Sequence, residues 1–336
     1  MSELLIGTLS FLLATNKPAA LTNLVLQRTG LVRVIAAATA PEAEPTDPIE
    51  RELRVILKAD NDAQAEADEW IRATETGEKD AELLKLTLKG RLEQRFQPIR
   101  KRYEEFIEKH PKHPGARLAY GSFLGDIGEE EQQVLHYEKA RELDPKNPAP
   151  WNNLANIYGH HGPIDKAFEY YEKAVELNPL EPVYWHNFAT TVFLFRKDAQ
   201  ERWKVDEQGV FRKAMELYGK ARELKPHDFI LASDIAETYY GIKPDPAPTE
   251  AGKKQSEARL VSEAMQSWTN ALDLADGPVE RQGVLTHLAR WHVRVGRYDD
   301  ARRMLNEVTN TVYLALRQRI ERSITNKVSK ASTGPK

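Results

Sequence analysis

Cysteine is absent from the 336 residues of this chain. Its absence excludes disulfides, thiolate catalysis and cysteine-ligated zinc or iron–sulfur sites, and it leaves the cellular compartment open. Neither sign of charge is in large excess: charged residues make up 29% of the chain, yet the net charge is only −3. This balance argues against a disordered polyelectrolyte and against a generally basic nucleic-acid binder. The composition indicates a soluble, folded chain.

Long apolar runs are missing as well. The run at Leu4–Ala14 is too short to span a bilayer, and the three residues before it include no Lys or Arg, so the basic start of a signal peptide is lacking. Pro18 is suited to a helix start and Gly30 to a helix end. We interpret residues 1–40 as a hairpin of two short helices and expect a cytoplasmic protein. The alternative is export, with the apolar run as an atypical signal.

Catalytic signatures are absent from the sequence too. There is no Gly-rich phosphate loop, no nucleophile elbow and no His-Glu-x-x-His motif. The histidines of "HPKHP" at residues 110–114 and the pair His160 and His161 fall at expected turns, where polar residues are common. A zinc site needs three or four converging ligands. We therefore predict no enzymatic activity, no cofactor and no bound metal.

What the chain does contain is a repeated segment. "YEEFIEKHP" begins at Tyr103, "YEKARELDP" at Tyr137, "YEKAVELNP" at Tyr171 and "YGKARELKP" at Tyr218. The first two steps are 34 residues each and the third is 47. Similarity at a fixed period of this size is typical of proteins built from stacked structural repeats.

The stretch from 148 to 181 carries the pattern most completely. Its marked positions are Trp151, Leu154, Ala155 and Tyr158 on an expected first helix, Gly162 at a turn, Ala167, Tyr171 and Ala174 on a second helix, and Pro179 at the end. The small residues allow the two helices to approach closely where they cross. With its 34-residue period, this pattern resembles the tetratricopeptide repeat, a helix–turn–helix unit.

The resemblance implies an all-α fold: a superhelix of about six such units, an α-solenoid, with an N-terminal helical extension and a C-terminal capping helix. We expect the array at residues 80–310, with units starting near 80, 114, 148, 182, 229 and 282. The unit near 80 is degenerate, with Phe106 in place of a small residue. An acidic linker and helices at 41–79 precede the array, and a capping helix at 311–330 and a disordered tail at 331–336 follow it.

The resemblance also implies a binding site, because first helices line the concave face in this family. The residues expected there are Asn152, Asn153, Asn156, His160, His186, Asn187 and Thr190. Asn153 and Asn187 are equivalent, and they look similar to the asparagine ladder of O-linked N-acetylglucosamine transferase repeats, which holds a peptide backbone. The flanking equivalents are Ala119, Asp234 and His287, so the ladder has two rungs. The alternative is that these are merely solvated polar residues.

Charge is unevenly distributed along the chain. Residues 42–82 hold fourteen acidic and five basic residues, whereas the chain from Arg281 onward holds twelve basic and four acidic ones. The basic end could bind nucleic-acid phosphates, an acidic protein or the acidic end of a second copy. Its candidate residues are Arg290, Arg294, Arg317, Arg319 and Arg322. No aromatic residues are interleaved with them for base stacking. We therefore predict a non-catalytic protein–protein interaction scaffold, with a nucleic-acid-associated adaptor as the alternative.

Overall fold

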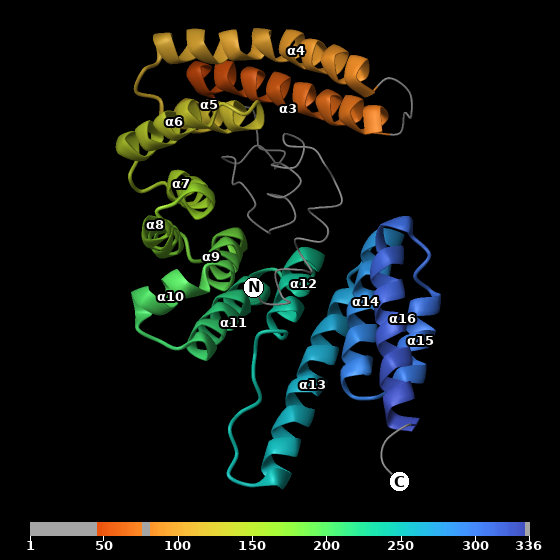
Figure 1. Cartoon of the computed structure of the whole chain (residues 1–336). Coiled ribbons are helices and arrows are strands. Elements are labelled where there is room, and N and C mark those ends of the chain that lie inside the picture. Colours follow the sequence, from red (N-terminus) through yellow and green to blue (C-terminus); the bar gives the residue numbers. More distant parts are fainter. Residues whose placement is uncertain (1–45, 76–80, 333–336) are drawn as a thin grey trace. The chain divides into compact units, whose positions relative to one another are not determined.

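Residues 46–75 and 81–332 are described by a computed structural model, and the regular elements in these ranges are all helices (Figure 1). The predicted all-α fold class is thereby confirmed. The contacts divide the chain after Asn178. We describe the N-terminal unit, residues 46–178, and the C-terminal unit, residues 179–332, separately. The expected hairpin at 1–40 lies outside the described residues.

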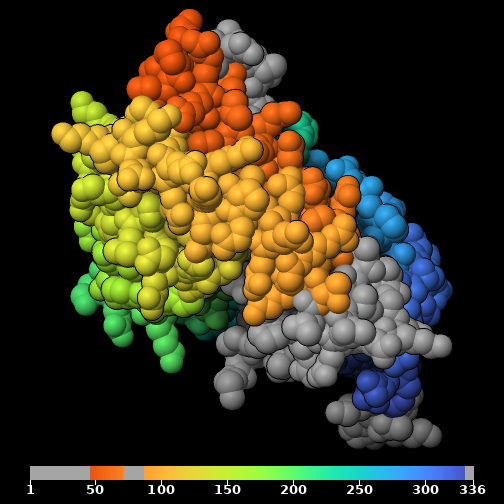
Figure 2. Space-filling view, turned by 90° about the horizontal axis from the view of Figure 1, so that it is seen from above, coloured from red at the N-terminus to blue at the C-terminus, as the bar shows by residue number. Residues whose placement is uncertain are grey.

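The N-terminal unit is a series of three antiparallel helix pairs. Its helices are α3 (Pro48–Glu75), α4 (Ala81–Lys109), α5 (Pro114–Asp126), α6 (Glu130–Leu143), α7 (Pro148–His161) and α8 (Ile164–Leu177). Each odd-numbered helix packs on the next one, and α4 and α6 make the contacts between consecutive pairs. Figure 2 shows α3 and α4 side by side, next to the yellow-green α5 and α6.

The first pair differs from the sequence-based expectation. Residues 81–109 form one helix with Pro98 inside it, so the expected degenerate helix–turn–helix unit starting near 80 is wrong. α4 instead pairs with α3, which is itself a single helix where separate helices were expected. No glycine or proline interrupts α3 after Pro48, and an apolar stripe on each helix closes the core. Phe106 of α4 is 1% exposed in the cluster that includes Leu53 of α3.

The starts of three first helices follow directly from the repeat. His113, Asn147 and Glu181 stand 34 residues apart, and each side chain accepts a hydrogen bond from a backbone N–H two or three residues further on. A proline follows each of them in the first helical turn, where its missing N–H costs nothing. The 34-residue period is therefore a period of helix caps as well as of core residues.

Glycine serves two purposes in the hairpins. Gly128 and Gly162 adopt φ of 84° and 74° at the turns after α5 and α7, a conformation that other residues rarely accept. Gly121 instead permits close approach, because a Cβ there would lie 2.7 Å from the ring of Tyr137 on α6. The equivalent of Gly121 in the next unit is Ala155, which is fully buried.

The C-terminal unit contains the longer, less regular repeats. Its helices are α9 (Pro182–Leu194), α10 (Arg196–Trp203), α11 (Glu207–Leu224), α12 (Phe229–Thr238), α13 (Glu250–Asp273), α14 (Pro278–Arg294), α15 (Tyr298–Asn306) and α16 (Thr311–Ser332). α9 pairs with α11, α12 with α13 and α14 with α15. The short α10 is the insertion that lengthens one repeat step to 47 residues. α16 packs on α14 and α15 through Ile320 and Ile324.

None of the helices in residues 46–75 and 81–332 is long and apolar enough to cross a membrane.

Candidate functional site

Most of the residues expected to line the groove are buried. Six of the seven are less than 9% exposed: Asn152, Asn153, Asn156, His186, Asn187 and Thr190. Only His160, at the end of α7, is exposed. The alternative interpretation of solvated polar residues is therefore wrong for six of them. A buried polar side chain needs hydrogen-bond partners, and helical periodicity alone does not reveal that neighbouring helices supply them.

One of these partners is the repeated tyrosine. Tyr171 on α8 donates its hydroxyl to Asn156 Oδ1 on α7 at 2.6 Å, and both residues are buried. Equivalent contacts occur in three other helix pairs: Tyr103 OH donates to Asp60 Oδ2 at 2.8 Å, Tyr137 OH lies 2.9 Å from Ser122 Oγ, and Tyr218 OH lies 3.1 Å from Thr190 Oγ1. A second-helix tyrosine thus meets a first-helix polar residue in four hairpins.

Sequence reasoning missed this contact, although the signal was present. Ser122 and Tyr137 are 15 residues apart, as are Asn156 and Tyr171. Burial raises the pKa of Tyr218, and the nearby carboxylate of Asp234 raises it further, so this hydroxyl stays protonated at neutral pH. Asn156 and Thr190, which were expected to contact a partner in the groove, therefore form hydrogen bonds within their own hairpins.

The tryptophans of two first helices bind the preceding turn. Trp151 Nε1 donates to the carbonyl oxygen of Pro145 at 3.1 Å, and Trp185 Nε1 donates to that of Pro179 at 2.9 Å. On α7, Trp151 also packs edge-on against the ring of Tyr170, with the centroids 5.0 Å apart. These contacts fix the first helices against the turns that precede them.

In the C-terminal unit, polar contacts connect three successive first helices. His186 Nε2 on α9 lies 2.7 Å from Asp234 Oδ2 on α12. Tyr240, just after α12, has its hydroxyl 3.1 Å from His287 Nδ1 on α14. The first-helix positions around these contacts are called the polar strip. Three of its residues are buried and four are partly accessible: His186, Asn187 and Thr190, and Asp234, Glu237, His287 and Arg290.

Two groups of the polar strip have displaced pKa values. Burial, together with the negative charge of Asp234, raises the pKa of Glu237 to about 7, although Arg290 acts in the opposite direction. Burial lowers the pKa of His287 to about 3, and the positive charge of Arg290 contributes. At neutral pH the His287 imidazole is therefore uncharged and Glu237 is close to half-protonated.

The five arginines of the alternative basic surface do not act together. Arg294 pairs with Glu257, with 2.7 Å between Nη2 and Oε1, and Arg317 pairs with Glu321 at 2.8 Å. Arg290 lies over the Tyr240 ring, 4.5 Å from its centroid. Like Arg290, the residues Arg319 and Arg322 have no acidic partner among the described residues, and they contact no aromatic ring there.

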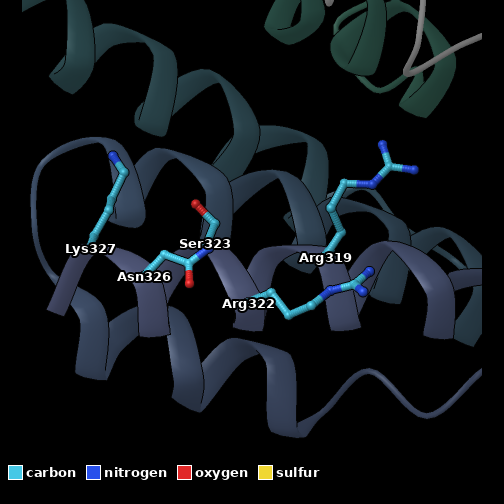
Figure 3. A pocket seen from close by; sticks show the side chains of 5 residues that line it. All are labelled: Arg319, Arg322, Ser323, Asn326 and Lys327. Carbon is cyan, nitrogen blue, oxygen red and sulfur yellow. The ribbon is translucent and has the colours of Figure 1, made fainter. Parts of the chain in front are cut away.

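These two arginines belong to a basic stripe on α16. Figure 3 shows its members along the helix, where they line a shallow hollow of about 400 Å³: Arg319, Arg322, Ser323, Asn326 and Lys327. Spacings of three and four residues place them on one side of the helix. The positive charges of Arg319, Arg322 and Lys327 would attract an anion to this hollow.

In the described ranges, no three His, Asp or Glu side chains converge as metal ligands.

A second hollow of about 820 Å³ lies between α3 and α4 in the N-terminal unit. Glu52 and Lys109 on its lining form an ion pair with 2.9 Å between Oε1 and Nζ. The rest of its lining also mixes both signs of charge, with Arg102, Glu105 and Glu108.

Comparisons with known proteins identify the repeat. A family model described as tetratricopeptide repeat matches residues 136–169, which cover the later part of α6, all of α7 and the start of α8. A search of curated proteins found no match. The resemblance inferred from the tyrosine spacing is confirmed by the family match.

Several solved structures are also similar. They include pilF of Pseudomonas aeruginosa (16% identity, 81% of this chain and 99% of that chain, TM-score 0.49), the C-terminal part of a TPR repeat-containing protein from Cytophaga hutchinsonii (13%, 82% and 98%, 0.48) and YrrB, described as a TPR protein with an unusual peptide-binding site (14%, 66% and 97%, 0.47). Similarities this low establish neither a shared function nor a shared partner.

Proposed function

This chain is a tetratricopeptide-repeat protein, and from that premise we propose that it is a non-catalytic scaffold that binds a polypeptide partner along the first helices of its repeats. The fold itself is typical of protein–protein interaction scaffolds. The observation that carries the finer proposal is the polar strip, in which α9, α12 and α14 present titratable and amide side chains at corresponding positions.

Amide, carboxylate and guanidinium groups together can form hydrogen bonds with the backbone of an extended chain. Its backbone offers N–H donors and C=O acceptors in alternation, and an Asn amide can satisfy both. Asn187 on α9 and Asn153 on α7 occupy equivalent positions in successive repeats. We propose that Asn153 and Asn187 contact the bound backbone, with Asn156 and His186 beside them setting its register.

The test is a titration with a partner retrieved from source-cell lysate, with and without nuclease treatment. Each neutral hydrogen bond contributes about 0.5–1.5 kcal/mol. Asn153→Ala plus Asn187→Ala should therefore weaken binding roughly ten- to a hundredfold. Because both residues are buried, the unfolding midpoint of this variant must be measured in parallel, and binding compared below that midpoint.

The matched control is Arg319→Ala plus Arg322→Ala on α16. Unchanged binding in this arginine variant, with loss in the asparagine variant, would support the proposed site. Loss confined to the arginine variant would refute it and move the site to the basic stripe.

A second candidate is that the basic stripe binds a polyanion. It is favoured by the absence of acidic partners for Arg319 and Arg322 among the described residues. Nucleic acid is one such partner, and retention that disappears after nuclease treatment would identify it. A second copy of this chain is another, because Asp62, Asp68 and Glu69 are exposed on α3. Lysine at these three positions should then abolish any association seen at low salt.

A further inference from the structure

The side-chain carboxyl group of Glu237, in the polar strip, has no hydrogen-bond or ion-pair partner among the described residues. It lies on α12, is only partly accessible, and is surrounded by groups that do not bond to it. Desolvation of the Glu237 carboxyl disfavours its charged form, and no ion pair within the described residues offsets that cost. Arg290 on the neighbouring α14 is also partly buried and forms no ion pair with Glu237.

In its own hairpin, Glu237 does not make the polar contact that the equivalent residues make. It stands where Asn156 and Thr190 stand in the preceding repeats, and each of those meets the tyrosine of its second helix. In the α12–α13 hairpin the tyrosine position holds Trp268, whose ring stacks on that of His287 with 4.0 Å between centroids. Trp268 Nε1 has no hydrogen-bond partner, so it does not bond to Glu237.

The charges near Glu237 indicate which kind of partner residue would pair with its carboxylate. Asp234, one helical turn earlier, adds a second negative charge and is itself held by His186 on α9. Tyr218 of α11, Tyr240 after α12 and His287 of α14 are uncharged at neutral pH. Of the charges that act on the Glu237 carboxyl, Asp234 disfavours its ionised form and Arg290 favours it. The guanidinium of Arg290 already lies over the Tyr240 ring.

We propose that Glu237, supported by Asp234, is the subsite for a lysine or arginine side chain of the bound polypeptide. This inference rests on the proposed function, since it assigns a partner residue to the same surface. A cation there would form an ion pair with the carboxylate of Glu237 and reduce its repulsion with Asp234, one helical turn earlier. An anionic residue would instead have to approach both carboxylates.

Proton linkage follows from the same arrangement. Glu237 is close to half-protonated at neutral pH, and a bound cation favours its ionised form. Binding should therefore release a proton and become tighter between pH 6 and pH 8. The groups that face Glu237 from the adjacent helices are His186, Asp234, Tyr218, Tyr240, His287 and Arg290. The comparison below substitutes Glu237 itself, so that a change in the pH profile is assigned to this group.

The experiment uses a display library of random twelve-residue peptides, selected at pH 8 against the full chain, against Glu237→Gln and against Glu216→Gln. Glu216 is exposed on α11 and forms no ion pair within the described residues, so it is the matched control. The wild type and the control should enrich peptides with Lys or Arg at a fixed position. Glu237→Gln should lose that preference.

The selected peptide is then titrated against each protein. Hydrogen bonds to charged groups support an expected loss of roughly ten- to a hundredfold in affinity for Glu237→Gln. Replacing the peptide's basic residue by norleucine should cost the wild type a similar factor and cost Glu237→Gln little. The norleucine comparison on the wild type is independent of whether the substituted protein folds normally.

The outcomes separate the two proposals. If the wild type enriches no peptide, the proposed function fails and this inference fails with it. If the wild type enriches peptides without a basic residue, or if Glu237→Gln binds them equally well, the cation subsite is refuted while the scaffold function stands. A pH profile that is identical for the wild type and Glu237→Gln would also refute it.

Discussion

The bond between Tyr171 and Asn156 offers the clearest stability test of the repeat. Tyr171 is fully buried and Asn156 is 4% exposed. Tyr171→Phe removes only the hydroxyl, which is 2.6 Å from Asn156 Oδ1. Asn156 Nδ2 already has no hydrogen-bond partner, so the substitution would leave the whole amide unsatisfied. A buried polar group that loses its partner costs about 1–3 kcal/mol.

A double-mutant cycle separates this bond from other effects of the substitutions. Asn156→Leu alone should also be destabilising, because it leaves the buried Tyr171 hydroxyl without its acceptor. The double variant removes both polar groups, and such paired replacements are close to neutral. We therefore expect its loss to be smaller than the sum of the single losses by roughly 1 kcal/mol or more.

The measurement is equilibrium unfolding in urea, followed by far-ultraviolet circular dichroism and by tryptophan fluorescence. Coincident transitions are required, because repeat arrays can unfold in stages. Tyr137→Phe is the comparison in the preceding hairpin: it removes the contacts of the hydroxyl with Ser122 Oγ and Gln133 Nε2, although Ser122 Oγ keeps its bond to the Leu118 carbonyl oxygen at 3.3 Å. Single variants within about 0.5 kcal/mol of the wild type, or strictly additive losses, would refute the reasoning.

Three further predictions concern packing, pH and the basic stripe. Ala174→Leu should overpack a fully buried position and cost roughly 1–3 kcal/mol in urea unfolding, whereas Ala65→Leu, exposed on α3, should have little effect; equal shifts would contradict this. Glu237 holds its proton more tightly in the folded chain, with a pKa of about 7 against an ordinary 4.5, so its contribution to stability is lost as pH rises through this window. Glu237→Gln should therefore be more stable than the wild type at pH 8, by at most about 3 kcal/mol, and equal to it below pH 4.5 in thermal unfolding; a difference of the opposite sign would exclude the assignment. Arg319→Ala plus Arg322→Ala should elute from heparin at lower salt than the wild type, and unchanged elution would remove the stripe as an anion site.

The fold was predictable because its local and long-range signals share one period. Tyrosines at 103, 137 and 171 gave the 34-residue step, and the helix caps His113, Asn147 and Glu181 keep the same step. α4 broke the pattern because its register of apolar residues continues through Pro98 without a turn. Its packing partner α3 carries no copy of the repeat, so the 34-residue period could not predict the α3–α4 pair.

The candidate site was predictable only in part. The sequence identified the polar first-helix positions, including Asn153 and Asn187, but it gave no measure of their burial. Exposure depends on neighbouring helices that are distant in sequence. Glu237 escaped notice because an unpartnered carboxylate is a property of three-dimensional surroundings, which the alignment of Asp234 with Asn187 does not reveal.

The location of a bound polypeptide tests the central claim most directly. A photo-crosslinking amino acid can be placed at position 160 or 237 on first helices, and at 176 or 216 on second helices as exposed controls. With the retrieved partner bound, the account predicts crosslinks to the partner from positions 160 and 237, suppressed by excess unlabelled partner, and none from 176 and 216. Crosslinks from the second-helix positions alone would contradict it.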